Sequence, residues 1–354
     1  MAIDGETKDI EQYRCEKCNA PYPLGADDVI ATCPYCGFTF TVGGDEIGRH
    51  LLLPNKLSPD EVVDVVKMWL SFAAGKSVGR GIMDQVEIET PDLRWIPFFR
   101  VRGNCQTYHL GGKKEKRGNR TVWKKIERSE NEEAEIWVIA RRHAATFGVE
   151  EYIETFQGLA TEDFDISSTE APVLNAEIGE EDANPRALYR KSEEDRVHLQ
   201  EELDRLFDYR INMDVTDRSY THAPYWLVRY NYMRGTFRVA VSGATGEVIL
   251  GELPVTKLYR MKRWLTSIVM FIASALLFQA LPYATAIILQ SSTDSEALLV
   301  PVLLFGGGAF LWVAGLIFLG HVLRYEVTLT ASGKEREDAF DFTDSVSSLG
   351  RRRR

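Results

Sequence analysis

The sequence predicts an α+β protein with a four-cysteine ribbon at its N-terminus, a central domain built on an antiparallel sheet, and a transmembrane hairpin of two helices. Two closely spaced cysteine pairs indicate the ribbon. Runs of β-branched and aromatic residues indicate the sheet, and two long uncharged apolar stretches indicate the hairpin. The predicted parts are a tail at 1–12, the ribbon at 13–42, the α+β domain at 50–255, the hairpin at 264–323 and a disordered tail at 331–354.

The overall composition limits the possible functions. The chain has 354 residues and a net charge of −10, which argues against a general nucleic-acid binder because phosphate contacts need clustered lysine and arginine. The first residues, MAIDGETKDIEQY, are acidic and polar, so no signal peptide is expected. Five cysteines, four of them in two tight pairs, indicate metal binding in a reducing compartment rather than a disulfide framework. The fifth, Cys105, has no partner cysteine and is interpreted as a structural thiol.

The two cysteine pairs have the spacing of a zinc ribbon. Cys15 and Cys18 form one C-x2-C pair, Cys33 and Cys36 form the second, and fourteen residues separate the pairs. Each pair is expected to form a turn that directs two sulfurs at one tetrahedral ion, and Gly37 suits the positive φ of such a turn. Four cysteine ligands predict a structural Zn²⁺ site with no open position for catalysis. Unligated thiols and a rubredoxin-type iron site, which expects a longer interval, are the alternatives.

The predicted ribbon carries little positive charge. Between Tyr13 and Val42, two basic residues stand against three acidic ones, which gives a net charge of −1. Such a surface lacks the electrostatic footprint that phosphate groups require. A structural or protein-docking ribbon is therefore favoured over one that binds nucleic acid.

The first predicted helix of the α+β domain follows Ser58. Ser58 as N-cap, Pro59 at the first helical position and Glu61 form a capping box, and the apolar residues after them recur at helical spacing. The region from Val86 to Phe156 is mostly strand-like. The acidic stretch from Glu150 to Asp182 predicts a strand followed by a solvated loop.

A second helix is predicted from Asn184 to about Tyr209, because Asn184 and Pro185 suit the cap and the first helical position. A β meander follows, with strands at Tyr225–Met233, Thr236–Val241 and Glu247–Leu250. Two stretches that enter a strand through proline and aromatic residues could mark two related halves or arise by chance. These stretches are Pro97–Arg102 and Pro224–Arg229, and the halves would be 50–182 and 183–255.

One stretch of the predicted sheet is locally basic. It contains Lys113, Lys114, Lys116, Arg117, Arg120, Lys124 and Lys125. The simpler interpretation is a solvated hairpin tip. The alternative is a binding site for anionic lipid or an acidic partner, with Lys113, Lys114, Lys116, Arg117 and Arg120 as the candidate contacts.

Two apolar stretches near the C-terminus predict the membrane anchor. No charged residue lies between Trp264 and Thr293, and none lies between Ala297 and Leu323. A helix needs roughly 20 apolar residues to cross the hydrocarbon core, so both stretches suffice, and buried core helices are the alternative. Pro282 is expected to kink the first helix. The glycine run from Gly306 to Gly308, followed by Ala309, either admits close helix packing or forms a flexible point.

The residues that flank the two stretches predict their orientation. Arg260, Lys262 and Arg263 precede the first stretch and Arg324 follows the second, whereas the loop between them, QSSTDSE, is acidic. The positive-inside rule therefore predicts a multi-pass protein of the cell membrane with both termini in the cytoplasm. The absence of charge within either stretch favours an anchor over a transport pathway.

Several of these segments resemble a family of prokaryotic membrane proteins that combine a TFIIB-type zinc ribbon with a transmembrane hairpin. The marks are the CPYCG turn and the segments LLPNKLSPDEVVDVVKMWL, WIPFFRVRG and YNYMRGTFRVAVSGATGEVILGELP, within residues 13 to 290. The first turn, CEKCN, departs from the family in lacking a glycine. Members often carry names that invoke a primosomal helicase because they share the ribbon. This sequence has no P-loop or other helicase motif, so that activity is not carried over.

The resemblance implies partnership with SPFH-type or phage-shock-type proteins in membrane stress. The first functional hypothesis is thus a non-enzymatic membrane scaffold that binds lipid, recruits protein partners or forms a homo-oligomer. The second is a membrane-bound enzyme with an unrecognised site in the middle domain, although none of the six histidines stands in a known motif. The third is a membrane-tethered nucleic-acid binder, which would need more basic surface than the chain offers.

Overall fold

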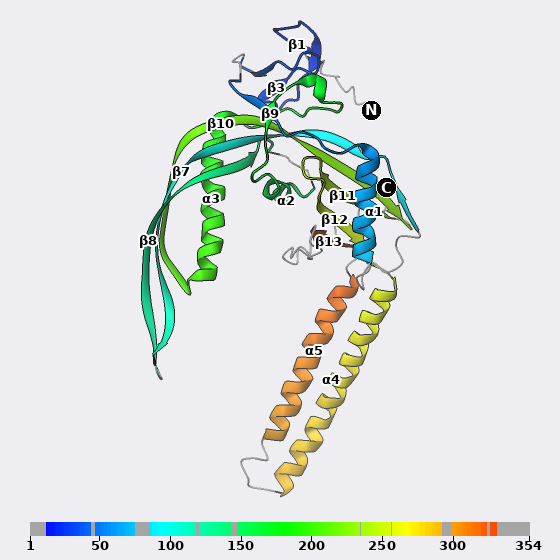
Figure 1. Ribbon diagram of the computed structural model, residues 1–354. Helices are drawn as coiled ribbons and strands as arrows, with labels where there is room; N and C mark the ends of the chain where they lie inside the picture. Colours follow the sequence, from blue (N-terminus) through cyan, green and yellow to red (C-terminus); the bar gives the residue numbers. More distant parts are fainter. Residues whose placement is uncertain are drawn as a thin grey trace, which may run out of the picture. The chain divides into compact units, whose positions relative to one another are not determined.

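The computed structural model describes residues 12–43, 47–74, 85–117, 120–142, 147–233, 235–255, 257–291, 299–323 and 326–330 (Figure 1). The chain divides into two compact units. Unit 1 comprises Met1–Val65, Thr90–Val228 and Ala240–Ile249, and unit 2 comprises Val66–Glu89, Arg229–Val239 and Leu250–Arg354. The predicted tail at 331–354 and the acidic loop around Asp294 lie outside the described residues.

The N-terminal part of unit 1 consists of two short antiparallel hairpins. The strands are β1 (Gln12–Arg14) with β2 (Pro21–Pro23), and β3 (Ile30–Thr32) with β4 (Thr39–Thr41). The buried side chains of Tyr22 and Phe40 fill the space between them, and Tyr13 stacks on Phe40 with ring centroids 4.9 Å apart. Each hairpin is too small to bury a core alone, so these rings and the cysteines form a shared one.

Three long strands dominate the rest of unit 1. They are β7 (Asp92–Arg117), β8 (Arg120–Ile139) and β10 (Arg205–Tyr232), and β7 pairs antiparallel with both others. Two short strands complete this side of the sheet, β5 (His50–Leu52) and β9 (Glu162–Asp163). The β5–β10 pair is parallel, an exception to the predicted antiparallel sheet.

The second predicted helix is shifted toward the N-terminus. Helix α3 runs from Glu180 to Glu202, and β10 already begins at Arg205, so the prediction of a helix to Tyr209 was wrong. The three acidic residues of its first turn interact favourably with the positive end of the helix dipole. This interaction stabilises a helix that begins earlier than predicted. Residues after 204 pair with β7 instead, because that strand offers free backbone partners along its length.

The stretch from Glu150 to Asp182 differs most from its prediction. Helix α2 (Val149–Glu154) replaces the expected strand, because Tyr152, Ile153 and Phe156 are buried at helical spacing. A short 3₁₀ turn, η2 (Ile166–Ser168), follows β9. The expected solvated loop is instead a strap across unit 1, residues 164–179, in which Ala176 and Ile178 are fully buried.

The main core of unit 1 lies between the sheet and α3. Phe99, Val101 and Cys105 project from one face of β7, and Ala183 and Ala187 of α3 belong to the same buried cluster. These β7 residues are separated by even numbers of positions, as expected for side chains on one face of a strand. Figure 1 shows α3 lying along β7 and β8. Cys105, interpreted from the sequence as a structural thiol, is fully buried in this core.

The remaining strands are β6 (Val86–Ile88), β11 (Gly235–Ser242), β12 (Val248–Pro254) and β13 (Glu326–Thr330). The predicted meander is confirmed, with β10 much longer than expected. Helix α1 (Pro59–Ala74) has the predicted capping box, since the Ser58 amide donates to Glu61 Oε2 over 2.8 Å. The ring of Trp69 covers Gly251 so closely that a Cβ there would lie 2.2 Å from it.

Two long helices, α4 (Lys257–Ser291) and α5 (Leu299–Leu323), form an antiparallel pair (Figure 1). The segments Arg260–Ala286 and Val300–Gly320 are long and apolar enough to cross a membrane. Within an 18-residue apolar window of each segment, 11% is buried, whereas the core helix of a soluble protein is mostly buried. Helix α4 continues through Pro282 to its end.

Candidate metal centre

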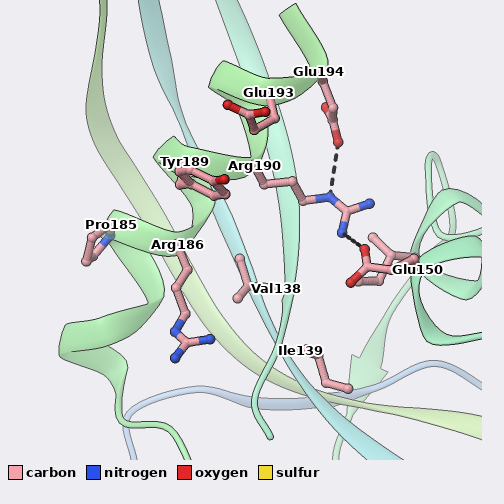
Figure 2. Close-up of a pocket in the computed structure, with 10 residues that line it drawn as sticks. Val138, Ile139, Glu150, Pro185, Arg186, Tyr189, Arg190, Glu193 and Glu194 are labelled. Atoms are coloured by element: carbon pink, nitrogen blue, oxygen red, sulfur yellow. Dashed lines mark hydrogen bonds and ion pairs between the residues drawn. The ribbon is translucent and has the colours of Figure 1, made fainter. Parts of the chain in front are cut away.

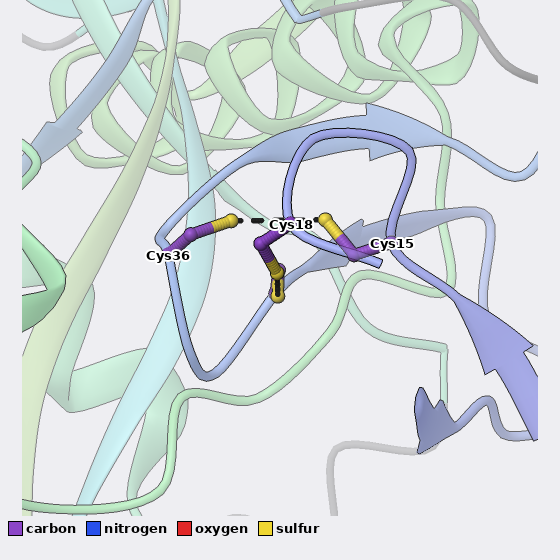
Figure 3. Close-up of side chains that lie close together, drawn as sticks. Cys15, Cys18 and Cys36 are labelled. Atoms are coloured by element: carbon purple, nitrogen blue, oxygen red, sulfur yellow. Dashed lines mark hydrogen bonds between the residues drawn. The ribbon is translucent and has the colours of Figure 1, made fainter. Parts of the chain in front are cut away.

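The four predicted cysteine ligands meet at one point of unit 1. The Sγ atoms of Cys15 and Cys36 are 3.7 Å apart, as are those of Cys18 and Cys33, and all four lie within 4.8 Å of one another. Figure 3 shows the side chains of Cys15, Cys18 and Cys36 directed toward this point. None of the five cysteines, all of which are described, forms a disulfide. The cluster can therefore bind a metal ion through sulfur.

Both cysteine turns use the same backbone device. Each turn closes with a hydrogen bond to the carbonyl of its first cysteine, from Asn19 N over 2.7 Å and from Gly37 N over 2.9 Å. Asn19 has φ 59° and Gly37 has φ 71°, both in the left-handed region. Asparagine tolerates that region better than other residues with a Cβ. The missing glycine in CEKCN is thus replaced by the next most suitable residue.

Backbone amides point at the cysteine sulfurs. Burial raises the pKa of the Cys15 thiol, but hydrogen bonds from the amides of Cys18 and Lys17 outweigh it and bring the pKa down to about 7. At Cys33, burial dominates and raises the pKa to about 12, against the hydrogen bonds from two amides. Partial positive charge on amide hydrogens stabilises thiolates, which are the form that binds metal.

The strap joins the metal centre to the rest of unit 1. Ala176 exchanges backbone hydrogen bonds with Ile30 of β3, at 3.1 and 2.9 Å. The amide of Thr32 donates to Asn175 Oδ1 over 3.1 Å, and the Asn175 amide group donates to Asp28 over 2.7 Å. Residue 37 packs against the strap as well, because a Cβ there would lie 3.2 Å from Ile166. The ribbon is therefore an integral part of unit 1.

A chain of hydrogen bonds also runs from the ribbon into the sheet. Thr39 Oγ1 lies 2.8 Å from His50 Nδ1, and His50 Nε2 lies 2.7 Å from His222 Nδ1. His222 Nε2 lies 2.9 Å from the carbonyl oxygen of Leu174. Because a carbonyl only accepts, His222 Nε2 carries its proton, and each neutral ring then donates in the same direction. This fixes Thr39 as the donor to His50.

The histidine pair is held in its neutral form. His222 is fully buried, and this burial lowers its pKa to about 4. Burial followed by repulsion from His222 lowers the pKa of His50 to about 2. Phe164 stacks on the His50 ring with centroids 3.7 Å apart, which excludes water from that face. This pair has no local signature in the sequence, because 172 positions separate the two histidines.

A groove of about 560 Å³ opens beside α3 (Figure 2). Its floor contains Val138, Ile139 and Ile153. Arg190 crosses one side and donates to Glu150 over 2.8 Å and to Glu194 over 3.0 Å. The residues that line it include three glutamates and Tyr189, and no histidine, cysteine or serine.

The predicted basic stretch forms the far end of the β7–β8 hairpin. Lys113, Lys114, Lys116 and Arg120 are exposed, whereas the side chain of Arg117 lies outside the described residues. These residues belong to β7 and β8 and are separate in sequence and in fold from the cysteine cluster. The structure therefore presents a candidate metal centre and an independent basic surface.

No protein-family model matches the chain, and neither a curated protein nor a solved structure matches it. The resemblance to zinc-ribbon membrane proteins thus stays a prediction based on the motifs alone.

Proposed function

We propose that the chain is a non-enzymatic scaffold or adaptor of the cell membrane, in which the ribbon and the α+β domain recruit protein partners or assemble with further copies. The observation that carries this proposal is the four-cysteine cluster, which is built into unit 1 through β3 and the strap. A metal ion with four protein ligands has no position left for substrate or water, so its contribution is to folding. The metal centre would therefore hold the surface of unit 1 around it in one conformation, to which partners can bind.

Zinc is the metal we propose for this centre. A tetrahedral ion with Zn–S bonds of about 2.3 Å requires sulfurs about 3.8 Å apart. Two of the Sγ separations, each 3.7 Å, support this assignment. The amides directed at Cys15 and Cys33 would stabilise the charge of a site formed by four thiolates and one dication.

The membrane assignment is supported by helices α4 and α5 and by the strands at their two ends. β12 precedes α4, β13 follows α5, and the two strands pair antiparallel over Leu250–Pro254 and Glu326–Thr330. Both ends of the hairpin thus return to the same sheet, as a two-span anchor requires. With the basic residues in the first turns of α4, this supports a cytoplasmic position for both flanks.

Contacts between α4 and α5 also support membrane packing. Ser267 donates to the Gly315 carbonyl and Ser274 donates to the Gly308 carbonyl, each over 2.8 Å. A Cβ at Gly308 would lie 3.0 Å from Phe278, so this glycine serves close packing rather than flexibility. Small residues and hydroxyl-to-carbonyl bonds are typical of helix pairs in lipid. The partners implied by the resemblance, SPFH-type or phage-shock-type proteins, belong to the same proposal.

The test combines metal analysis with partner recovery. Tagged full-length protein is purified from native membranes, its zinc content is measured by mass spectrometry, and co-purified proteins are identified. The Cys15→Ser/Cys18→Ser variant should lose the one equivalent of zinc and its partners while remaining in the membrane fraction. Cys105→Ala, which removes a thiol outside the cluster, is the matched control and should retain both.

Two outcomes would contradict the proposal. Iron instead of zinc in the wild-type protein would refute the metal assignment. Unchanged partner recovery after zinc loss would show that the ribbon has no docking role.

A further inference from the structure

The β7–β8 hairpin extends beyond the strand that supports it. The last pair between β7 and β10 is Gly112 with Arg205, whereas β7 and β8 remain paired up to Arg117 and Arg120. The hairpin is about 60 Å long from Phe98 at about 3.3 Å per residue. Beyond Gly112, the end of the hairpin thus consists of two strands, and no third strand among the described residues pairs with them.

The cations at this end are mostly without acidic partners. Lys124 pairs with Glu115 over 3.1 Å, and Lys125 pairs with Glu127 over 2.5 Å. Among the described residues, Lys113, Lys116 and Arg120 are exposed and form no ion pair. Their charge is available for an anionic ligand.

Two exposed aromatic rings lie among these cations. Trp123 is 53% exposed and Phe207 is 56% exposed. Both rings border Gly112, where a Cβ would lie 3.0 Å from Trp123 and 3.1 Å from Phe207. Lys114 Nζ lies 5.1 Å from the Trp123 ring and the Arg205 guanidinium 5.5 Å from the Phe207 ring.

Strand register places Lys114, Lys116 and Trp123 on one face, and Lys113 and Arg120 on the other. Lys114 is directly opposite Trp123 and Lys116 is opposite Thr121, two positions along the same face. We define the tip face as Lys114, Lys116, Trp123, Arg205 and Phe207. Single exposed apolar residues are ordinary, but two adjacent rings with stacked cations indicate a surface that meets a ligand.

We propose that the tip face binds the surface of a bilayer that contains anionic phospholipid. Tryptophan rings favour the level of the lipid headgroups, and clustered lysine and arginine are attracted to anionic headgroups. This inference rests on the proposed membrane anchor, because tethering by α4 and α5 raises the local concentration of lipid around the rest of the chain. The tip face is then a second, reversible attachment of the same chain to its membrane.

The test uses full-length protein in vesicles whose phosphatidylcholine carries brominated acyl chains, a quencher of tryptophan emission. The emission of Trp123 is obtained as the difference between the wild-type protein and Trp123→Phe. Trp264 and Trp312 of the helices contribute equally to both and cancel. Trp123 emission should be quenched when phosphatidylglycerol is included, and not in pure phosphatidylcholine or at high salt.

Charge variants test the electrostatic part. Lys114→Gln with Lys116→Gln should reduce the ratio of bound to free tip roughly 25-fold, since each lysine near an anionic surface contributes roughly five-fold. The matched control, Lys56→Gln with Arg186→Gln, removes the same charge from exposed positions outside the tip face and should leave quenching unchanged.

Flotation of the vesicles after alkaline extraction reports the anchor separately. Protein that does not float contradicts the membrane anchor itself. Protein that floats while Trp123 is never quenched, or is quenched equally in neutral and anionic vesicles, overturns the lipid-binding tip but leaves the anchor intact. If the tip-face pair and the control pair of substitutions abolish quenching equally, the effect of charge is nonspecific. That result would also overturn the lipid-binding tip.

Discussion

The four-cysteine cluster and the histidine pair lie in the same unit and depend on opposite charge states. The cysteines lie within 22 positions of one another, and a bound dication requires them as thiolates. His50 and His222 come from strands that are far apart in the sequence, and burial keeps both of their hydrogen-bonded rings neutral. One cluster concentrates charge around an ion, and the other excludes charge from the core.

Thr39 connects the two clusters. It lies three positions after Cys36 and donates to His50, so β4 belongs to both the metal ribbon and the histidine chain. We therefore expect disturbance of either cluster to be felt at β4, but in response to different agents. A chelator acts on the cysteines, whereas mild acid acts on the histidines.

The largest expected effect is that of metal removal. A chelator should lower the free energy for opening of the ribbon by about 5 kcal/mol or more, since structural zinc sites contribute energies of this order to folding. Amide hydrogen exchange of the full-length protein measures this, with protection lost first in β1–β4. Protection in α3 should fall less. A ribbon that stays protected without metal would show that the aromatic core and the strap suffice to fold it.

The next effect comes from the histidine pair. His222→Gln breaks the defined donor order and leaves buried polar groups of His50 and Leu174 without their partner, so we expect a loss on the order of 2–4 kcal/mol in the stability of unit 1. His198→Gln, on the exposed face of α3, is the matched control and should change stability little. Zinc content should be retained in both variants, which separates this effect from that of metal loss.

The histidine pair should also make the stability of unit 1 depend on pH in mildly acidic solution. A histidine has a pKa of about 6.5 in an unfolded chain, whereas burial lowers that of His222 to about 4. Between these pH values only the unfolded state binds the proton. The contribution of His222 to the free energy of unfolding is therefore complete above pH 6.5 and is lost as the pH falls toward 4. The slope of stability against pH should be smaller in His222→Gln by about 1.4 kcal/mol per pH unit. Equal slopes would mean that His222 is already accessible to protons.

The two clusters also differ in how far the sequence predicts them. The cysteine positions and the turn at Gly37 follow from local spacing, because each pair spans four residues and only fourteen residues separate the pairs. The histidine pair depends on the pairing of β5 with β10 and on the strap, which are long-range features with no local pattern. The strap itself looked like a solvated loop because its buried Ala176 and Ile178 stand among acidic residues.

Other differences have the same origin. Strand β13 follows the second apolar helix and has five residues, too few to show a strand period in the sequence. Its extended conformation depends on pairing with β12. The capping box of α1 was predictable because Ser58 and Glu61 bond to each other. The end of α3 was not, because the partner strand β7 decides it.

The smallest expected effects are those of substitutions in the two cysteine turns. Gly37→Ala places a Cβ on a residue with φ 71° and 3.2 Å from Ile166, so we expect a cost of about 1–2 kcal/mol. That corresponds to a roughly 5- to 30-fold weaker metal affinity, measured by competition with a chromophoric chelator. Asn19→Gly removes a Cβ at φ 59° and should change the affinity by less than about three-fold. If both substitutions weakened binding equally, the left-handed turn would not be what positions the sulfurs, and the Asn19 side chain would be contributing to the site directly.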